Sequence, residues 1–166
     1  KYMVRAIESA GYSVEEMGIA LDVAATEFHK EDGYHMDGKV LSSDELANVY
    51  SGWLDKYPIV SIEDGFGEDD WRGWTNFTKR EGHRVQSVGD DLFVTQSERL
   101  AQGIELGAAN AMLVKLNQVG TVTETLESMD LATSHGYNNV ISHRSGETED
   151  VTIADLAVGT RAGQIK

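Results

Sequence analysis

The amino-acid sequence predicts an α/β fold in which parallel strands alternate with helices, and three observations support it. Short apolar runs of strand type recur along the chain, segments with helical spacing separate them, and a polar residue stands at or near the end of each run. The expected strands cover residues 19–23, 59–62, 85–88, 112–116, 140–141 and, more weakly, 164–165. The order is helix and then strand, repeated.

The segments between these runs carry helix start and stop signals. In a capping box, a hydroxyl residue and a glutamate three positions later satisfy the free backbone donors of the first turn. Such pairs are Ser42 with Glu45, Thr95 with Glu98, and Thr121 with Glu124. Glycines that follow a helical pattern and precede a strand are expected to adopt a left-handed conformation. They are Gly11, Gly82, Gly107 and Gly136.

The spacing of the strand-end polar residues favours a barrel. These residues are Asp22, Glu63, Asp90, Lys115, Ser142 with His143, and Lys166. After the first interval they recur about every 23 to 28 residues, close to the βα unit of an eight-stranded barrel. We therefore predict one domain over residues 1–166, a partial TIM-type (β/α) barrel with about six of eight strands that lacks its first strands and final helix. An open doubly wound sheet is the alternative, but no Gly-rich turn follows the first strand.

Composition excludes several classes of function. The chain has 28 acidic and 14 basic side chains and a net charge of −14, which repels nucleic acid and attracts cations. No apolar run approaches the ~18 residues of a membrane span, so membrane insertion is not expected. The absence of cysteine leaves oxygen and histidine ligands for any metal and suits a reducing cytoplasm.

Three carboxylates at consecutive strand ends predict a metal site. Asp22, Glu63 and Asp90 each stand beside apolar strand residues, where a charge is costly unless a partner neutralises it. Three hard oxygen donors suit Mg²⁺. Alternatively, each acid caps a helix or pairs with a surface base. The spacing also leaves open whether Asp90 or Asp91 is the third ligand. The remaining acids near these ends, Asp64, Asp69, Asp70 and Asp91, are expected to be solvated turn or helix-start residues.

Two lysines are candidates for a catalytic role at the same strand ends. Lys115 lies within the apolar run Met112–Leu116, where it either snorkels to solvent or has a function. A nearby dication and a second lysine would lower its pKa and leave a neutral amine able to remove a proton. Lys166 could be that second lysine.

The segment 142–150 places polar groups directly after a strand. Arg144 can grip a phosphate bidentately, Ser145 can donate to it, and Gly146 permits a close backbone approach. The competing interpretation is a capped helix start in which Arg144 pairs with Glu147. We expect surface positions for His29, His35, His83 and His135, and helix or core packing for Trp53, Trp71 and Trp74. Residues 30–39 are expected to form an excursion between a strand and a helix.

Several motifs together resemble the enolase family, and the similarity runs through nearly the whole chain. The segments that carry it are 21–28 (LDVAATEF), 61–64 (SIED), 89–92 (GDDL), 116–124 (LNQVGTVTE) and 142–150 (SHRSGETED). The last of these is highly specific. Gly65 and Gln96 stand where many enolases have proline and asparagine, which are loop differences.

The resemblance implies a role for each matched residue. Asp22, Glu63 and Asp90 would bind the catalytic Mg²⁺, with Asp90 chosen over Asp91. Lys115 matches the general base. The residues implied to bind substrate are Glu63, Asp90, Ser142, His143, Arg144, Ser145 and Lys166.

The resemblance also implies the reaction, which is the reversible dehydration of 2-phosphoglycerate to phosphoenolpyruvate through a Mg²⁺-stabilised enolate. The parent enzyme would be a glycolytic lyase, a dimer or larger homo-oligomer, cytoplasmic and, as for other enolases, also found at the cell surface or secreted without a signal peptide. Enolases supply the general acid as a glutamate upstream of the matched stretch. We therefore expect residues 1–166 alone to be inactive and poorly soluble.

Two alternatives remain open at this stage. The chain could belong to a related enzyme that acts on a non-phosphorylated carboxylate with the same metal and base. It could also serve as an adhesive fragment in which Lys166 is the handle for a lysine-binding partner.

Overall fold

A computed structural model describes residues 1–166 and shows a curved parallel sheet with helices on its outer side. Five strands form it: β1 (Ile19–Asp22), β5 (Ile59–Glu63), β6 (Gln86–Gly89), β7 (Ala111–Val114) and β8 (Asn138–Ile141). They pair in the order β1-β5-β6-β7-β8, each parallel to its neighbour. The predicted α/β fold with parallel strands is confirmed.

The sixth expected strand is reduced to a single bridge. Ile165 pairs in parallel with Ile141, and the Lys166 amide donates to the Ile141 carbonyl at 2.7 Å. The run 164–165 is too short to extend the ladder, but it still brings Lys166 to the end of β8.

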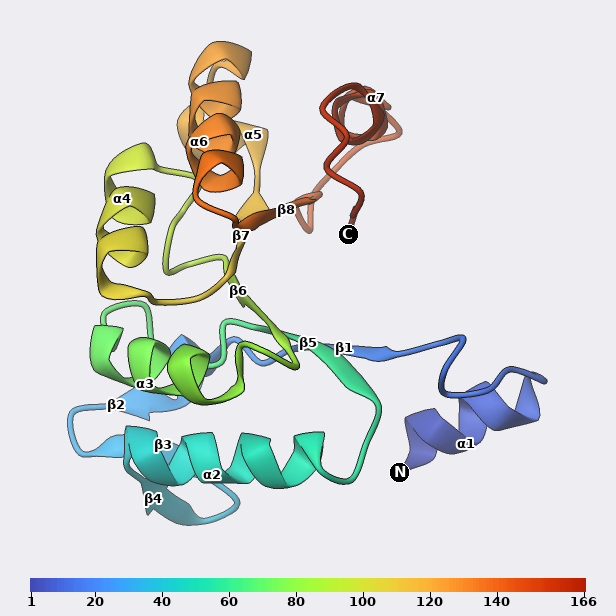
Figure 1. The fold of residues 1–166 in the computed structure, drawn as a ribbon, viewed down its shortest axis with the longest axis vertical. Coiled ribbons are helices and arrows are strands. Elements are labelled where there is room, and N and C mark those ends of the chain that lie inside the picture. The colour runs from blue at the N-terminus through green and yellow to red at the C-terminus, as the bar shows by residue number, and fades with distance from the viewer.

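The helices follow the strands along the outside of the arc (Figure 1). They are α1 (Tyr2–Ser9), α2 (Ser43–Leu54), α3 (Trp71–Glu81), α4 (Ser97–Leu106), α5 (Leu116–Val119), α6 (Val122–Ser134) and α7 (Thr152–Gly159), with a 3₁₀ turn, η1, at Ala25–Phe28. In Figure 1, α2, α3, α4 and α6 lie on the convex side of the sheet, and both termini lie on its open side. None of these helices combines the length and apolar character needed to cross a bilayer.

The predicted excursion at residues 30–39 is a small antiparallel sheet. Its strands are β2 (His29–Lys30), β3 (Gly33–Met36) and β4 (Lys39–Leu41), paired in sequence order. Tyr34 on β3 is buried, and its hydroxyl donates to Asp70 Oδ2 at 2.7 Å and accepts from the Gly67 amide at 2.9 Å. The excursion therefore braces the loop that follows β5.

Helix caps divide into confirmed and wrong predictions. Ser42 and Glu45 form a full capping box at α2, and Thr121 accepts from the Glu124 amide at α6. The box expected at Thr95 is wrong, because α4 begins after Gln96, and Thr95 is a fully buried residue with φ 58°.

The glycine prediction also holds in part. Gly11, Gly107 and Gly136 have positive φ, whereas Gly82 has φ −60°. Gly82 instead provides space, since a Cβ there would lie 2.5 Å from the Thr78 carbonyl oxygen.

The core lies between the sheet and the outer helices. Its largest fully buried side chains are Trp74, Tyr34, Tyr50, Phe66 and Phe77. Tyr50 donates to the Gly65 carbonyl at 2.8 Å, and Trp74 Nε1 donates to the Gly67 carbonyl at 3.1 Å. These hydrogen bonds from buried aromatic side chains also fix the turn after β5, the strand that ends at Glu63.

Candidate active site

The carboxyl ends of the five parallel strands meet at one edge of the sheet, and the polar residues expected there are present. Asp22 and Glu63 are the last residues of β1 and β5 and pair across the ladder. Asp90, Lys115 and Ser142 directly follow β6, β7 and β8. Lys115 therefore lies between β7 and α5 rather than inside the strand. The topology brings residues from five separate segments to one edge.

Lys166 joins the first two carboxylates. Its Nζ donates to Asp22 Oδ2 at 2.8 Å and to Glu63 Oε1 at 2.7 Å. Burial raises the pKa of Glu63, and the Lys166 hydrogen bond only partly opposes it. Burial acts to lower the pKa of Lys166, but its bonds to Asp22 and Glu63 outweigh that effect and leave it raised. These three residues line a cavity of about 810 Å³.

Lys115 pairs with the third carboxylate. Its Nζ donates to Asp90 Oδ2 at 2.5 Å, and the two side chains are only 15% and 12% exposed. The other oxygen, Asp90 Oδ1, is buried and has no hydrogen-bond partner. Because a buried acceptor without a partner is costly, this oxygen marks a place where a donor or a cation would be bound favourably.

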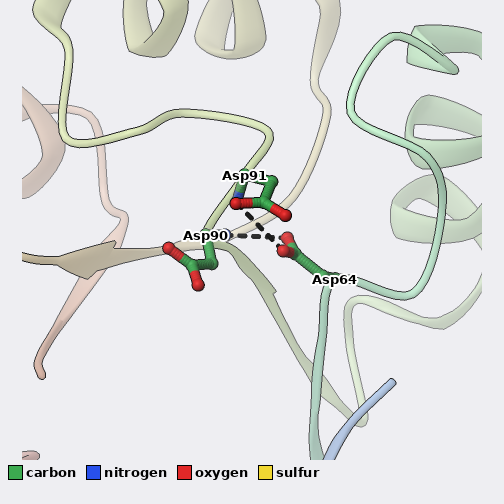
Figure 2. Close-up of side chains that lie close together, drawn as sticks. All are labelled: Asp64, Asp90 and Asp91. Carbon is green, nitrogen blue, oxygen red and sulfur yellow. Dashed lines mark hydrogen bonds between the residues drawn. The ribbon is translucent and has the colours of Figure 1, made fainter. Parts of the chain in front are cut away.

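Asp64 is not the solvated acid that the sequence suggested. It is 4% exposed, and its carboxylate accepts from the backbone amides of Asp90 at 2.8 Å and Asp91 at 2.9 Å. Burial raises its pKa to about 7, although both amide bonds oppose the shift. Figure 2 shows the Asp64 carboxylate facing the turn that carries the other two aspartates. Asp64 therefore holds the start of the turn after β6.

A family comparison adds to this geometry. A family model described as the enolase C-terminal TIM barrel domain matches residues 1–166, the whole chain. The chain belongs to the enolase family. The curved parallel sheet with outer helices is accordingly part of an enolase TIM barrel, as the strand-end spacing predicted.

Enolases use divalent magnesium, and the donors present here fit such an ion. Carboxylate oxygens are hard ligands, and Asp90 Oδ1 is a buried acceptor in need of a partner. The three acids whose oxygens lie within 4.8 Å of one another are Asp64, Asp90 and Asp91. This group differs from the predicted ligands Asp22, Glu63 and Asp90, and both oxygens of Asp64 already accept backbone bonds. Asp90 is common to both groups.

The loop that the sequence predicts to bind substrate follows β8. Ser142 is buried and donates to the His143 carbonyl at 3.0 Å, while the His143 amide donates to the Lys166 carbonyl at 3.1 Å. Ser142 and Arg144 line a second pocket of about 290 Å³. Leu116, the residue after Lys115, lines it as well. His143 and Ser145 are exposed and do not line it.

The alternative interpretation of this loop is confirmed in one respect only. The Arg144 amide donates to Glu147 Oε2 at 3.3 Å, so the two residues are in contact at the turn. The guanidinium of Arg144, however, is absent from the ion pairs of the structure. Its charge remains available for an anion.

Other sequence predictions near the edge have mixed outcomes. Asp70 caps α3 through the Gly73 amide, and Asp69 is exposed, both as expected. Asp91 is only partly exposed, and burial raises its pKa. His29, His83 and His135 are exposed and His35 is half-buried, whereas Trp74 is fully buried and Trp53 and Trp71 pack against the core.

Two positioning residues escaped sequence reasoning. Asp64 directly follows Glu63 in a turn with φ 44°, a conformation that aspartate tolerates better than most residues. Thr95 looked like a helix cap but lies at the other end of the turn that begins with Asp90. In both cases the hydrogen-bond partners are distant in sequence, so local patterns carry no signal for them.

Proposed function

We propose that this domain holds the metal and substrate of an enolase that interconverts 2-phosphoglycerate and phosphoenolpyruvate. The observation that supports it best is the pairing of two ammonium groups with three carboxylates at one sheet edge. Lys115 contacts Asp90, and Lys166 contacts both Asp22 and Glu63. In this proposal Asp22, Glu63 and Asp90 hold Mg²⁺, which when bound supplies positive charge that stabilises the charge developing on the substrate carboxylate.

Lys115 is the proposed general base. Its Nζ is partly buried, so it can act in a water-poor environment on the proton next to the substrate carboxylate. To do so it must give up its proton and its present bond to Asp90. The apolar strand β7 before it and the helix α5 after it fix where its side chain starts.

Lys166 is the proposed partner of the substrate carboxylate. An ammonium group has three N–H donors, and the structure uses two of them on Asp22 and Glu63. The third can donate to a substrate oxygen without loss of these contacts. The interaction strengthens as negative charge grows on that oxygen, which is the condition for it to accelerate the reaction.

The loop after β8 is the proposed phosphate site. Arg144 lines the pocket next to Leu116, and its guanidinium is in none of the ion pairs. Ser145 directly follows it and is exposed. A guanidinium and a hydroxyl together can bind the oxygens of a phosphate group. A phosphorylated small carboxylate is therefore the proposed substrate.

The release of water requires a general acid, which in enolases is a glutamate upstream of the matched segment. We infer that residues 1–166 alone do not complete the dehydration. The test therefore uses the protein expressed from its complete reading frame.

The metal assignment is tested by Asp90→Asn. We expect Mg²⁺ binding, measured by titration calorimetry, to weaken and kcat for 2-phosphoglycerate to fall by more than about 100-fold, because an amide is a poorer ligand for a hard cation. Asp69→Asn is the matched control, since Asp69 is an exposed acid on a neighbouring loop. Wild-type values for Asp90→Asn would contradict the assignment.

The phosphate assignment is tested by Arg144→Ala. We expect KM for 2-phosphoglycerate to rise by roughly 10- to 100-fold, because a charge-assisted bond to the phosphate is lost. Arg5→Ala, which removes an exposed arginine on α1, should leave KM unchanged. An unchanged KM for Arg144→Ala would instead favour a related enzyme that acts on a non-phosphorylated carboxylate.

A further inference from the structure

Thr95 holds the backbone of Lys115 from outside the active site. Its Oγ1 accepts a hydrogen bond from the Lys115 amide at 3.0 Å and donates one to Gln118 Oε1 at 2.7 Å. Thr95 is fully buried, and its carbonyl accepts from Ser128 Oγ at 2.9 Å. One hydroxyl therefore links the backbone of Lys115, the first residue after β7, to the side chain of Gln118 on α5.

The backbone that presents this hydroxyl is strained. Val94 and Thr95 have φ values of 43° and 58°, although both are β-branched and neither is glycine. A left-handed backbone is costly for residues of this kind, so the surrounding structure must enforce it. The Val94 amide donates to the Asp90 carbonyl at 2.7 Å, and the strained pair turns Thr95 toward the end of β7.

The same short turn links both members of the Lys115–Asp90 pair. At its start, Asp64 accepts the amides of Asp90 and Asp91. At its end, Thr95 accepts the amide of Lys115. The turn 90–95 therefore fixes the place from which each side chain departs, and the distance between Lys115 Nζ and the Asp90 carboxylate depends on both anchors.

We propose that Thr95 is a positioning residue that aims Lys115 at the substrate proton. The inference rests on the proposed function, in which Lys115 is the general base. A proton transfer is sensitive to the placement of the base, and a displacement of about 1 Å can lower a rate by ~10²-fold. Without the Thr95 hydroxyl the Lys115 amide loses its acceptor, and the start of α5 is free to shift.

A purely structural role would have different consequences. A buried hydroxyl that only stabilises the fold changes the free energy of unfolding and leaves the chemistry of the folded enzyme as it was. Thr125 provides the comparison, since it is equally buried and its Oγ1 donates to the Thr121 carbonyl at 2.8 Å within α6. It does not touch Lys115.

The test compares Thr95→Val with Thr125→Val in the protein from the complete reading frame. For Thr95→Val we expect kcat for 2-phosphoglycerate to fall at least tenfold with KM within about twofold of wild type. Substrate deuterated at the carbon that loses its proton should show a larger isotope effect on kcat than in wild type, because proton removal has become slower. Thr95→Ser keeps the hydroxyl and should restore kcat to within about threefold of wild type. Thr125→Val should change only thermal stability.

The other possible results also distinguish a positioning role of Thr95 from a purely structural one. A folded Thr95→Val with wild-type kcat, or equal losses in both valine variants without a change in isotope effect, would overturn the positioning role. If Thr95→Val does not fold, Gln118→Met is decisive, because it removes the partner of the Thr95 hydroxyl at a half-buried position. A reduced kcat with a raised isotope effect supports the proposal, and an unchanged kcat overturns it. A wild type that does not dehydrate 2-phosphoglycerate overturns the proposed function and this inference together, whereas an active wild type with an indifferent Thr95→Val overturns only the latter.

Discussion

At the scale of single residues, Asp64 shows how a buried acid can hold the backbone of the candidate active site. Its two oxygens accept the amides of two consecutive residues, one of which is the proposed ligand Asp90. Its own backbone continues the sheet, because its amide donates to Val88 and its carbonyl accepts from Ala25. One residue therefore connects the ends of β1, β5 and β6.

Asp64→Ala should destabilise the protein by about 3 kcal/mol, because two amides at a buried turn lose a carboxylate acceptor. Urea denaturation measures the free energy of unfolding. Asp69→Ala is the control, and we expect a change below about 0.5 kcal/mol because Asp69 is exposed and pairs only with Arg99 at 3.4 Å. Equal effects of the two substitutions would show that the Asp64 bonds are dispensable.

Sequence reasoning at this scale succeeded for strand-end residues and failed for turns. Asp22, Glu63 and Asp90 could be placed because each stands at a fixed position relative to an apolar run. In the sequence, Asp64 looks the same as a solvated acid. Only its hydrogen bonds from backbone amides 26 and 27 positions later distinguish it. Thr95 matches a capping motif in the sequence. Its left-handed backbone conformation, which keeps it outside α4, depends on tertiary contacts.

At the scale of elements, α2 and α3 are joined by a network centred on Glu81. This acid is 4% exposed and accepts from Ser51 Oγ on α2 at 2.5 Å and from Arg84 Nε at 2.6 Å. Arg84 in turn contacts Asp55 at 2.8 Å, just beyond the end of α2. The network fixes the spacing of two outer helices whose loops lead into β5 and β6.

Glu81 should make the stability of the protein depend on pH. The Arg84 hydrogen bond lowers the pKa of Glu81 below its usual value of 4.5 in spite of burial. Its contribution to stability is therefore fully present above about pH 4.5 and is lost as the pH falls through the lowered, folded-state pKa. Glu81→Gln should cost about 1–2 kcal/mol at pH 7, and the difference from wild type should shrink below pH 4.5.

Urea denaturation at several pH values measures this difference, with Glu105→Gln on the exposed face of α4 as the control. A cost for Glu81→Gln that stays constant from pH 7 to pH 3 would contradict the role assigned to the network.

At the scale of the whole fold, the sheet that residues 1–166 form is open. It ends in β1 on one side and in the single bridge beyond β8 on the other. Parallel barrels have no free edges, whereas an unpaired strand edge is a template for association. The strand rhythm of the sequence predicted this arrangement well, because periodicity and spacing act over whole elements, but it could not predict that the last run would form only one bridge.

The purified chain of residues 1–166 should therefore self-associate as its concentration rises, which sedimentation velocity can follow. Ala20→Lys places a charge on the edge strand β1 at an exposed position and should reduce the association. Gln102→Lys makes the same change in charge at an exposed position of the outer helix α4 and should have less effect. A chain that stays monomeric at all concentrations would show that the open edge is protected.

The central claim is that Lys115, held at the end of β7 beside Asp90, removes the proton next to the substrate carboxylate. Its most direct test is the exchange of that proton of 2-phosphoglycerate with solvent deuterium, followed by NMR, in the wild type and in Lys115→Met of the protein from the complete reading frame. We expect the substitution to lower the exchange rate by about 10²- to 10⁴-fold, the usual contribution of a general base. Exchange at the wild-type rate in Lys115→Met would contradict the account.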